Sequence, residues 1–252
     1  MNEIKDIELF NNISKKYIFK DINPCSSIAR KQRLNRSISN ISLSNKNILE
    51  IGCGAGFTVK YLDSSYKSYT GIDYSNELID YAIDNFKGGK VDFQCINANK
   101  IEFNKKFDII IAIGVIHHMD KPESIVQIIL NYLKEDGVFV INEPVKESIF
   151  LRLLRKIRSN FDSNYSSDQT FYTKREYIKI LSSKNYCIDK IFYQGILSTP
   201  FAEVIFKNKI FYYLCFFLIL IENILERNFS FFTKSISWNI VLHIKHVNEK
   251  NL

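Results

Sequence analysis

The chain has 252 residues, of which 46% are hydrophobic and 24% are charged, and four are proline. This composition excludes a disordered or low-complexity chain, and the length fits one α/β domain with insertions. The formal net charge of +7 leaves nucleic acid, an anionic membrane surface or an acidic small molecule as candidate partners, beside a plain solvated surface.

Residues 1–46 precede the first strand pattern and lack the apolar stretch of a signal peptide. The five scattered cysteines form no Cys-x-x-Cys pair, so we expect neither a disulfide framework nor a metal site. We therefore expect a cytoplasmic protein whose residues 1–46 form covering helices. The basic stretch 29–38 fits such a cover helix better than a helix lying on lipid.

Apolar strand patterns alternate with amphipathic helix patterns along most of the chain. Strands are predicted at residues 45–54, 68–73, 90–99, 107–119 and 136–144, and helices at 57–65, 75–86 and 121–133. A further helix and strand follow over 173–195, and residues 235–246 alternate as a last strand. This order predicts an α/β fold with a doubly wound, mostly parallel, seven-stranded sheet and a helical insertion before the last strand.

Five of the predicted strands end in glycine or polar residues. Parallel strands with right-handed crossovers place ligand sites at their carboxyl ends. These positions are Gly52–Gly56, Asp73, Asn97, the pair His117 and His118, and Glu143. Because they meet at one edge of the sheet, we predict that this edge is the functional site.

Three glycines at alternate positions, Gly52, Gly54 and Gly56, follow the first strand. They indicate a tight turn, or a turn whose backbone a ligand approaches closely. The third glycine comes one residue too early for the Gly-x-Gly-x-x-Gly dinucleotide fingerprint. Asp73 suits a pair of ribose hydroxyls, because a carboxylate accepts from both, and Glu50 can accept from a cationic or hydroxylated ligand.

Five segments, in this order and spacing, resemble a class I S-adenosylmethionine-dependent methyltransferase of the small-molecule type, similar to methyltransferase domains 11 and 25. They are ILEIGCGAGFTVKYL, YTGIDYSNELIDYA, VDFQCINANKIEF, FDIIIAIGVIHHMD and LKEDGVFVINEP. The resemblance is good over residues 47–145 and loose over 168–194. It implies a Rossmann-like methyltransferase fold with a cofactor-binding core at 47–145. Residues 146–252 would add substrate-facing helices and the last strands within the same domain.

The resemblance also implies a cofactor, S-adenosyl-L-methionine, and its binding residues. These are Glu50, Gly52, Cys53, Gly54, Gly56, Asp73, Tyr74, Asn97, Ala98, Ala112 and Ile113. The backbone of Gly52 and Gly54 would lie closest to the methionine part. Ala112 and Ile113 would offer carbonyl groups to its amino group.

The nucleoside part of the cofactor would lie further along the same edge. Asp73 would hold the ribose hydroxyls, Tyr74 would lie against the adenine, and Asn97 with Ala98 would meet the adenine edge. The family often has Asp where this chain has Asn97. Asn keeps a carbonyl acceptor, and Asn99 could share its role.

Methyl transfer from a sulfonium needs alignment of the reacting atoms, and needs a general base only when the acceptor must lose a proton. His117 and His118 are the candidate bases, because imidazole titrates near neutral pH. Ordering of a loop by hydrogen bonds is the alternative for both. Glu143 is the candidate substrate contact, with capping of the strand end as an equal alternative.

Two later segments have unusual polarity. Residues 146–159 combine an apolar face with several arginines, which is typical of a helix on anionic lipid or of a lid packed on the fold. Residues 210–221 are apolar throughout, yet too short for a membrane span, which needs about 20 residues. This run lies in the insertion 198–235 and fits a buried helix, a dimer contact or an interfacial segment.

We therefore predict a methyltransferase acting on a small, hydrophobic or lipid-linked molecule, with oxygen as the favoured acceptor atom. The segments 146–159 and 210–221 suggest contact with the membrane surface, and the insertion suggests a homodimer. We expect no nucleic-acid partner, since no RNA-binding module accompanies the basic residues. A non-catalytic cofactor-binding scaffold and an RNA-directed methyltransferase stay open as alternatives.

Overall fold

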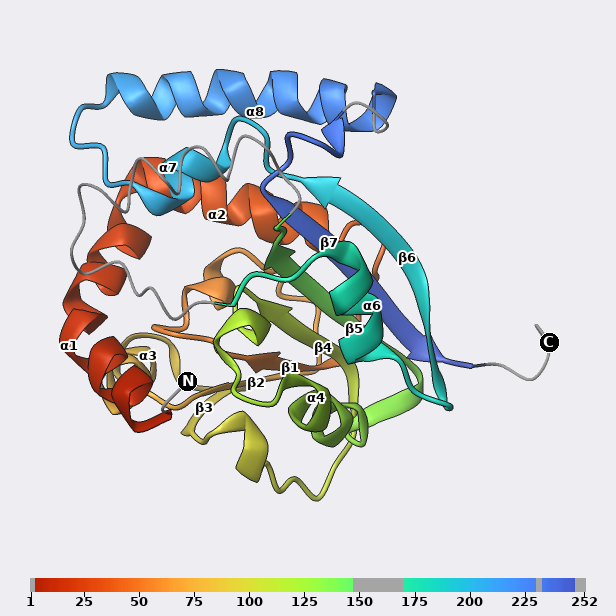
Figure 1. Cartoon of the computed structure of the whole chain (residues 1–252). Coiled ribbons are helices and arrows are strands. Elements are labelled where there is room, and N and C mark those ends of the chain that lie inside the picture. The colour runs from red at the N-terminus through yellow and green to blue at the C-terminus, as the bar shows by residue number, and fades with distance from the viewer. Residues whose placement is uncertain (1–2, 147–169, 230–232, 248–252) are drawn as a thin grey trace.

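The computed structural model describes residues 3–146, 170–229 and 233–247, and contains one seven-stranded sheet flanked by helices (Figure 1). The strands are β1 (Asn47–Ile51), β2 (Ser68–Asp73), β3 (Val91–Cys95), β4 (Phe107–Ile113), β5 (Leu133–Pro144), β6 (Tyr186–Gln194) and β7 (Asn239–His246). Their order is β3-β2-β1-β4-β5-β7-β6. The pairs among β1–β5 are parallel, and β7 runs antiparallel between β5 and β6. This topology confirms the predicted mostly parallel, seven-stranded sheet.

Helices cover the sheet and its carboxyl edge. They are α1 (Glu3–Ile22), α2 (Pro24–Ser37), α3 (Asn76–Phe86), α4 (Pro122–Leu130), α6 (Lys174–Leu181), α7 (Thr199–Glu203) and α8 (Ile210–Asn228). The 3-10 helices η1 (Phe57–Lys60), η2 (Ala98–Lys100) and η3 (Ile116–His118) follow β1, β3 and β4. Helix α3 begins where predicted, because Ser75 Oγ accepts from the backbone N–H of Leu78.

Several predicted elements are shorter in the structure than the sequence suggested, and two of them have a clear local reason. The helix expected at 57–65 is only the 3-10 helix η1. The β-branched Thr58 and Val59 are poor helix formers, and a turn follows in which the Asp63 side chain accepts from the Ser65 N–H. The fourth strand, expected to reach residue 119, ends at Ile113. Gly114 then takes a φ of 68°, which turns the chain out of the sheet.

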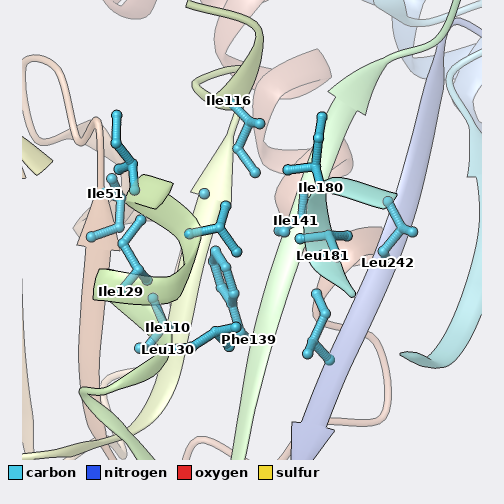
Figure 2. Packing of buried hydrophobic residues seen from close by; sticks show 14 of the residues in the cluster. Ile51, Ile110, Ile116, Ile129, Leu130, Phe139, Ile141, Ile180, Leu181 and Leu242 are labelled. Atoms are coloured by element: carbon cyan, nitrogen blue, oxygen red, sulfur yellow. The ribbon is translucent and has the colours of Figure 1, made fainter. Parts of the chain in front are cut away.

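Apolar side chains on both faces of the central strands form the core. Figure 2 shows Ile110 of β4 and Phe139 of β5 lying among side chains from helices, including Leu130 of α4 and Leu181 of α6. The alternate residues of the same strands pack on the other face, against α2 and α3. A strand covered on both faces is apolar at nearly every position, which explains near-continuous apolar runs such as Ile109–Ile110–Ile111.

The insertion between β6 and β7 starts and ends at the carboxyl edge of the sheet. Gln194, the last residue of β6, pairs with Asn239, and Asn239 pairs with Pro144 at the end of β5. Helices α7 and α8 therefore lie beside α2 at this edge, as Figure 1 shows at the top of the molecule. No helix in the described ranges is long and apolar enough to cross a membrane. The segment predicted as a basic amphipathic helix, 146–159, lies outside the described residues except for Lys146.

Candidate functional site

The turn after β1 has three glycines with positive φ, at 68° for Gly52, 52° for Gly54 and 77° for Gly56. A Cβ atom on Gly52 would lie 2.4 Å from Val115 Cγ2, and one on Gly56 would lie 2.8 Å from the Phe93 ring. These two glycines are therefore required by the packing of the protein itself. No described atom lies within 4 Å of a Cβ on Gly54, so the space beside this residue is open.

Asp73, at the end of β2, holds this turn through its carboxylate. Its Oδ2 accepts from the Gly54 N–H at 2.9 Å, and its Oδ1 accepts from the Ser75 N–H at 3.0 Å. Burial raises the pKa of Asp73, while these backbone N–H groups act against the rise. Each carboxylate oxygen has a second lone pair, so Asp73 can accept from a ligand hydroxyl beside the open space at Gly54.

Glu50 lies beneath the turn, with its oxygens engaged by side chains of the protein. Its Oε1 accepts from Thr58 Oγ1 at 2.8 Å, and its Oε2 accepts from the Tyr69 hydroxyl. Burial raises the pKa of Glu50 to about 7. These contacts fix η1 against β2, and a contact of Glu50 with the cofactor stays a prediction.

The loop after β3 has its own local support. Asn97 caps η2, and its side-chain oxygen accepts from the Asn99 N–H at 3.1 Å. Ala98 is the first residue of η2, and Ile96 N–H donates to the Asp73 carbonyl at 2.9 Å. Residues 97 and 98 therefore follow β3 at the same edge of the sheet as Asp73. Contact with adenine stays a prediction.

The ends of β4 and β5 carry a buried carboxylate and a histidine in direct contact. Glu143 Oε2 lies 2.6 Å from His117 Nδ1, and Glu143 Oε1 accepts from the N–H groups of Val115 and Ile116 at 2.7 and 2.8 Å. Glu143 is completely buried. A carboxylate can only accept, so Nδ1 carries the hydrogen, and Nε2 is the nitrogen that can take a proton.

His118 packs on its neighbour, with the two ring centroids 4.0 Å apart. The His117 ring also stacks on Phe171, which precedes α6. Burial, with a smaller effect from His117, lowers the pKa of His118 well below its ordinary value. His118 is therefore neutral near pH 7, and its role as a general base stays a prediction.

These contacts join four of the five predicted strand ends. Asp73 binds the turn at Gly54, Gly52 faces Val115, and Val115 binds Glu143 beside His117. Ala112 and Ile113 end β4 immediately before this loop, and Gly114 N–H donates to the Asn142 carbonyl at 2.8 Å. Helix α1 lies over the glycine turn, since Tyr17 and Ile18 pack on the cluster of Ala55, Phe57 and Leu78.

Sequence reasoning missed the residues that support the site rather than line it. Val115 supplies the close contact with Gly52, Thr58 and Tyr69 bind Glu50, and Gly114 makes the turn before η3. Gly114 left a signal, because a glycine interrupts an otherwise β-branched run and indicates a strand end. Thr58 and Tyr69 left none that separates them from ordinary core residues.

Comparison with known proteins agrees with this fold. The family model described as "Methyltransferase domain" matches residues 42–203, which is more than half of the chain. The chain belongs to this family and is a class I S-adenosylmethionine-dependent methyltransferase by family. The cofactor of the family is S-adenosylmethionine.

Individual relatives are distant. The chain is 26% identical over 160 residues to a malonyl-[acyl-carrier protein] O-methyltransferase of Acetivibrio thermocellus, covering 60% of this chain and 56% of the relative. It is also 26% identical to a ubiquinone biosynthesis O-methyltransferase of Rickettsia canadensis, covering 55% and 62%. The matched region thus spans little more than half the length of these relatives.

A solved structure of low sequence identity shares the fold over nearly its whole length. Magnesium protoporphyrin IX methyltransferase from Synechocystis PCC 6803, solved with bound SAH, superimposes with a TM-score of 0.66 at 11% identity. The match covers 96% of this chain and 99% of that one. At this coverage the match extends past residue 203, where the family model ends, into α8 and β7.

Proposed function

We propose that this chain transfers a methyl group from S-adenosylmethionine to a hydroxyl oxygen of a small, hydrophobic or lipid-linked molecule. The observation that carries the proposal is the buried Glu143 carboxylate that holds His117 Nδ1 at 2.6 Å. A base fixed in this way is useful for a hydroxyl acceptor, which must lose its proton, and is dispensable for an acceptor that is already deprotonated. The relatives that act as O-methyltransferases support the choice of oxygen.

The residues at the sheet edge fit the cofactor. The open space beside Gly54 adjoins the Asp73 carboxylate, and the positive φ of Gly54 is suited to a turn whose backbone meets a ligand. Asp73 would hold the ribose. The adenine would lie against Tyr74, Asn97 and Ala98. The methionine part would lie against the glycine turn, Cys53 included, and against Ala112 and Ile113.

When bound, S-adenosylmethionine supplies an electrophilic methyl group on a sulfonium. The protein residues then have positioning and proton-transfer roles. Glu143 keeps Nδ1 of His117 protonated and Nε2 able to accept, and it also fixes the backbone of Val115 and Ile116. His117 Nε2 would take the proton from the acceptor hydroxyl. Glu143 would act through His117 as a positioning residue, and its direct contact with substrate stays a prediction.

Incubation of the protein with methyl-labelled cofactor and fractionated cell extracts tests the proposal. We expect label in the lipid fraction, and expect His117→Ala to reduce it strongly while cofactor binding persists. Label confined to the aqueous fraction would overturn the substrate class. Cofactor binding without label in any fraction would favour the non-catalytic scaffold.

A further inference from the structure

Helix α8 turns its two carboxylates, Glu222 and Glu226, toward the protein. Glu222 accepts from the N–H groups of Leu197 and Ser198 at 2.5 and 2.8 Å, and from the Ser198 hydroxyl at 2.6 Å. Glu226 accepts from the Gly195 N–H at 2.7 Å and from Arg36 Nε at 3.0 Å. These buried carboxylates fix the rotation of α8 about its axis, because a carboxyl group left inside the protein without these donors would be strongly unfavourable.

The inward side of α8 completes a small apolar cluster. Cys215 and Ile219 pack with Cys25 and Ala29 of α2 and with Phe201 of α7. The orientation of α8 is therefore set by both its polar and its apolar contacts. The side chains on the opposite face are consequently held outward.

That outward face is apolar. Tyr213 is 70% exposed, Ile210 is 64% exposed, and Phe217 and Ile224 are each 58% exposed. Positions 210, 213, 217 and 224 recur at helical spacing and make one stripe. Further exposed apolar side chains beside it are Leu214, Phe216 and Leu220. A contiguous apolar face of this kind on a folded protein marks an interaction surface.

The charges around the stripe have one sign. Lys207 and Lys209 are exposed before the first turn of α8, and Arg227 is exposed in its last turn. The acidic residues between positions 204 and 229 are Glu222 and Glu226, and both are buried. The outward face thus presents aromatic and aliphatic groups with cations at both ends and no exposed carboxylate in that segment.

The position of α8 relates this face to the candidate site. The insertion leaves the sheet after Gln194 and returns at Asn239, which pairs with Pro144 directly after Glu143. α8 and the His117–Glu143 pair are therefore at the same edge of the sheet. A surface that docks α8 would lie on the side of the molecule where the strand ends open.

We propose that the outward face of α8 docks on an anionic lipid surface, with the helix lying in the plane of the headgroups. An interfacial helix needs one apolar face and flanking cations, and α8 has both. A second copy fits less well, because two such helices packed face to face would bring cationic ends together. This docking site extends the proposed function, because it names the surface at which the protein would meet a hydrophobic substrate.

Flotation of the full chain tests the proposal, using phosphatidylcholine vesicles with and without an equal part of phosphatidylglycerol. We expect the parent chain to float with the anionic vesicles. In the double variant Phe217→Glu with Ile224→Glu, the fraction that floats should fall by on the order of tenfold. Lys207→Glu with Lys209→Glu is a second variant, which leaves the apolar contacts unchanged and should reduce anionic binding alone. The matched control is Ile178→Glu, an exposed apolar position on α6, which should float like the parent.

Cofactor binding by calorimetry shows that each variant is folded, and no methyl acceptor is present during flotation. The outcome is therefore separate from the outcome of the methyl-transfer assay. A parent chain that stays with the aqueous phase in both vesicle mixtures would overturn the proposal. A second contradicting result would be a parent chain that does not float and that light scattering shows to be a dimer. If Phe217→Glu dissociated this dimer, the outward face of α8 would bind a second copy instead of lipid.

Discussion

Glu143 Oε2 lies 2.6 Å from Nδ1 of His117, although the two residues are 26 positions apart in the chain. The register of the sheet brings them together, since Ile113 of β4 pairs with Asn142 of β5. Beyond these paired positions, β4 turns at Gly114 into η3 while β5 continues to Glu143. The pair therefore links the fold directly to the proposed proton transfer.

Glu143→Gln should leave the cofactor site intact and reduce turnover. The amide oxygen can still accept from Val115 and Ile116, but the amide nitrogen would donate to His117 Nδ1 and place the hydrogen on Nε2. We expect kcat to fall by about 100-fold or more, the range of general-base effects, with the Kd for the cofactor changed by less than about threefold. Steady-state kinetics and calorimetry measure the two quantities.

His117→Ala is the companion to that substitution, and it should reduce kcat by a similar factor. The double variant should be little worse than either single one, because the two residues act as a unit. Turnover unchanged in Glu143→Gln would show that the pair only orders the loop.

Two glycines of the same turn should respond differently to alanine. Gly52→Ala places a methyl group against Val115 and should destabilise the protein by about 3 kcal/mol or more. Gly54→Ala meets no described atom within 4 Å and should cost only the positive-φ strain, about 1–2 kcal/mol. Chemical denaturation gives both values.

The cofactor should separate the same two variants in a second way. The new methyl group of Gly54→Ala lies in the space that we assign to the cofactor, so its Kd should rise by about tenfold or more although the protein folds. Normal binding by folded Gly54→Ala would place the cofactor elsewhere.

Glu50 should make stability depend on pH. Its pKa is about 7 in the folded protein against an ordinary value of 4.5, because burial disfavours the ionised form. The folded state then holds more protons than the unfolded state between these values, so the Glu50 contribution to the free energy of unfolding falls as pH rises from 4.5 to 7 and is constant above. At about 1.4 kcal/mol per unit, this contribution is on the order of 3 kcal/mol.

Glu50→Gln removes that titration while its amide can still bond to Thr58 and Tyr69. Without cofactor, we expect this variant to be more stable than the parent at pH 8 and the difference to close near pH 4.5. Urea denaturation across this pH range measures it. A difference that does not change with pH would mean that Glu50 keeps an ordinary pKa.

The sequence alone predicts the sheet and its carboxyl edge because the strands are covered on both faces. This burial forces continuous apolar runs such as residues 109–113, and the residues after each run are then visible as polar or glycine positions. The order and spacing of the motifs along the chain also indicated the protein family. The parallel order of the inner strands followed from their alternation with helices.

The same patterns could not show how side chains at the edge pair with one another. The contact of Glu143 with His117 depends on strand register, and the contacts of Glu50 with Thr58 and Tyr69 depend on which of the two covered faces of β1 carries Glu50. Helix α8 also extends beyond the apolar run 210–221. Glu222 and Glu226 are one helical turn apart and share its inward face, which the composition of the run does not reveal.

The most direct test of the whole account is calorimetric binding of S-adenosylmethionine to the parent chain and to Asp73→Ala. The Asp73 carboxylate holds the Gly54 N–H and is the acceptor assigned to the ribose, so the parent should bind and Asp73→Ala should bind at least about 30-fold more weakly. Asp73→Asn, which keeps one acceptor oxygen, should fall between them. A parent chain that does not bind this nucleoside, or equal binding by a folded Asp73→Ala, would contradict the account.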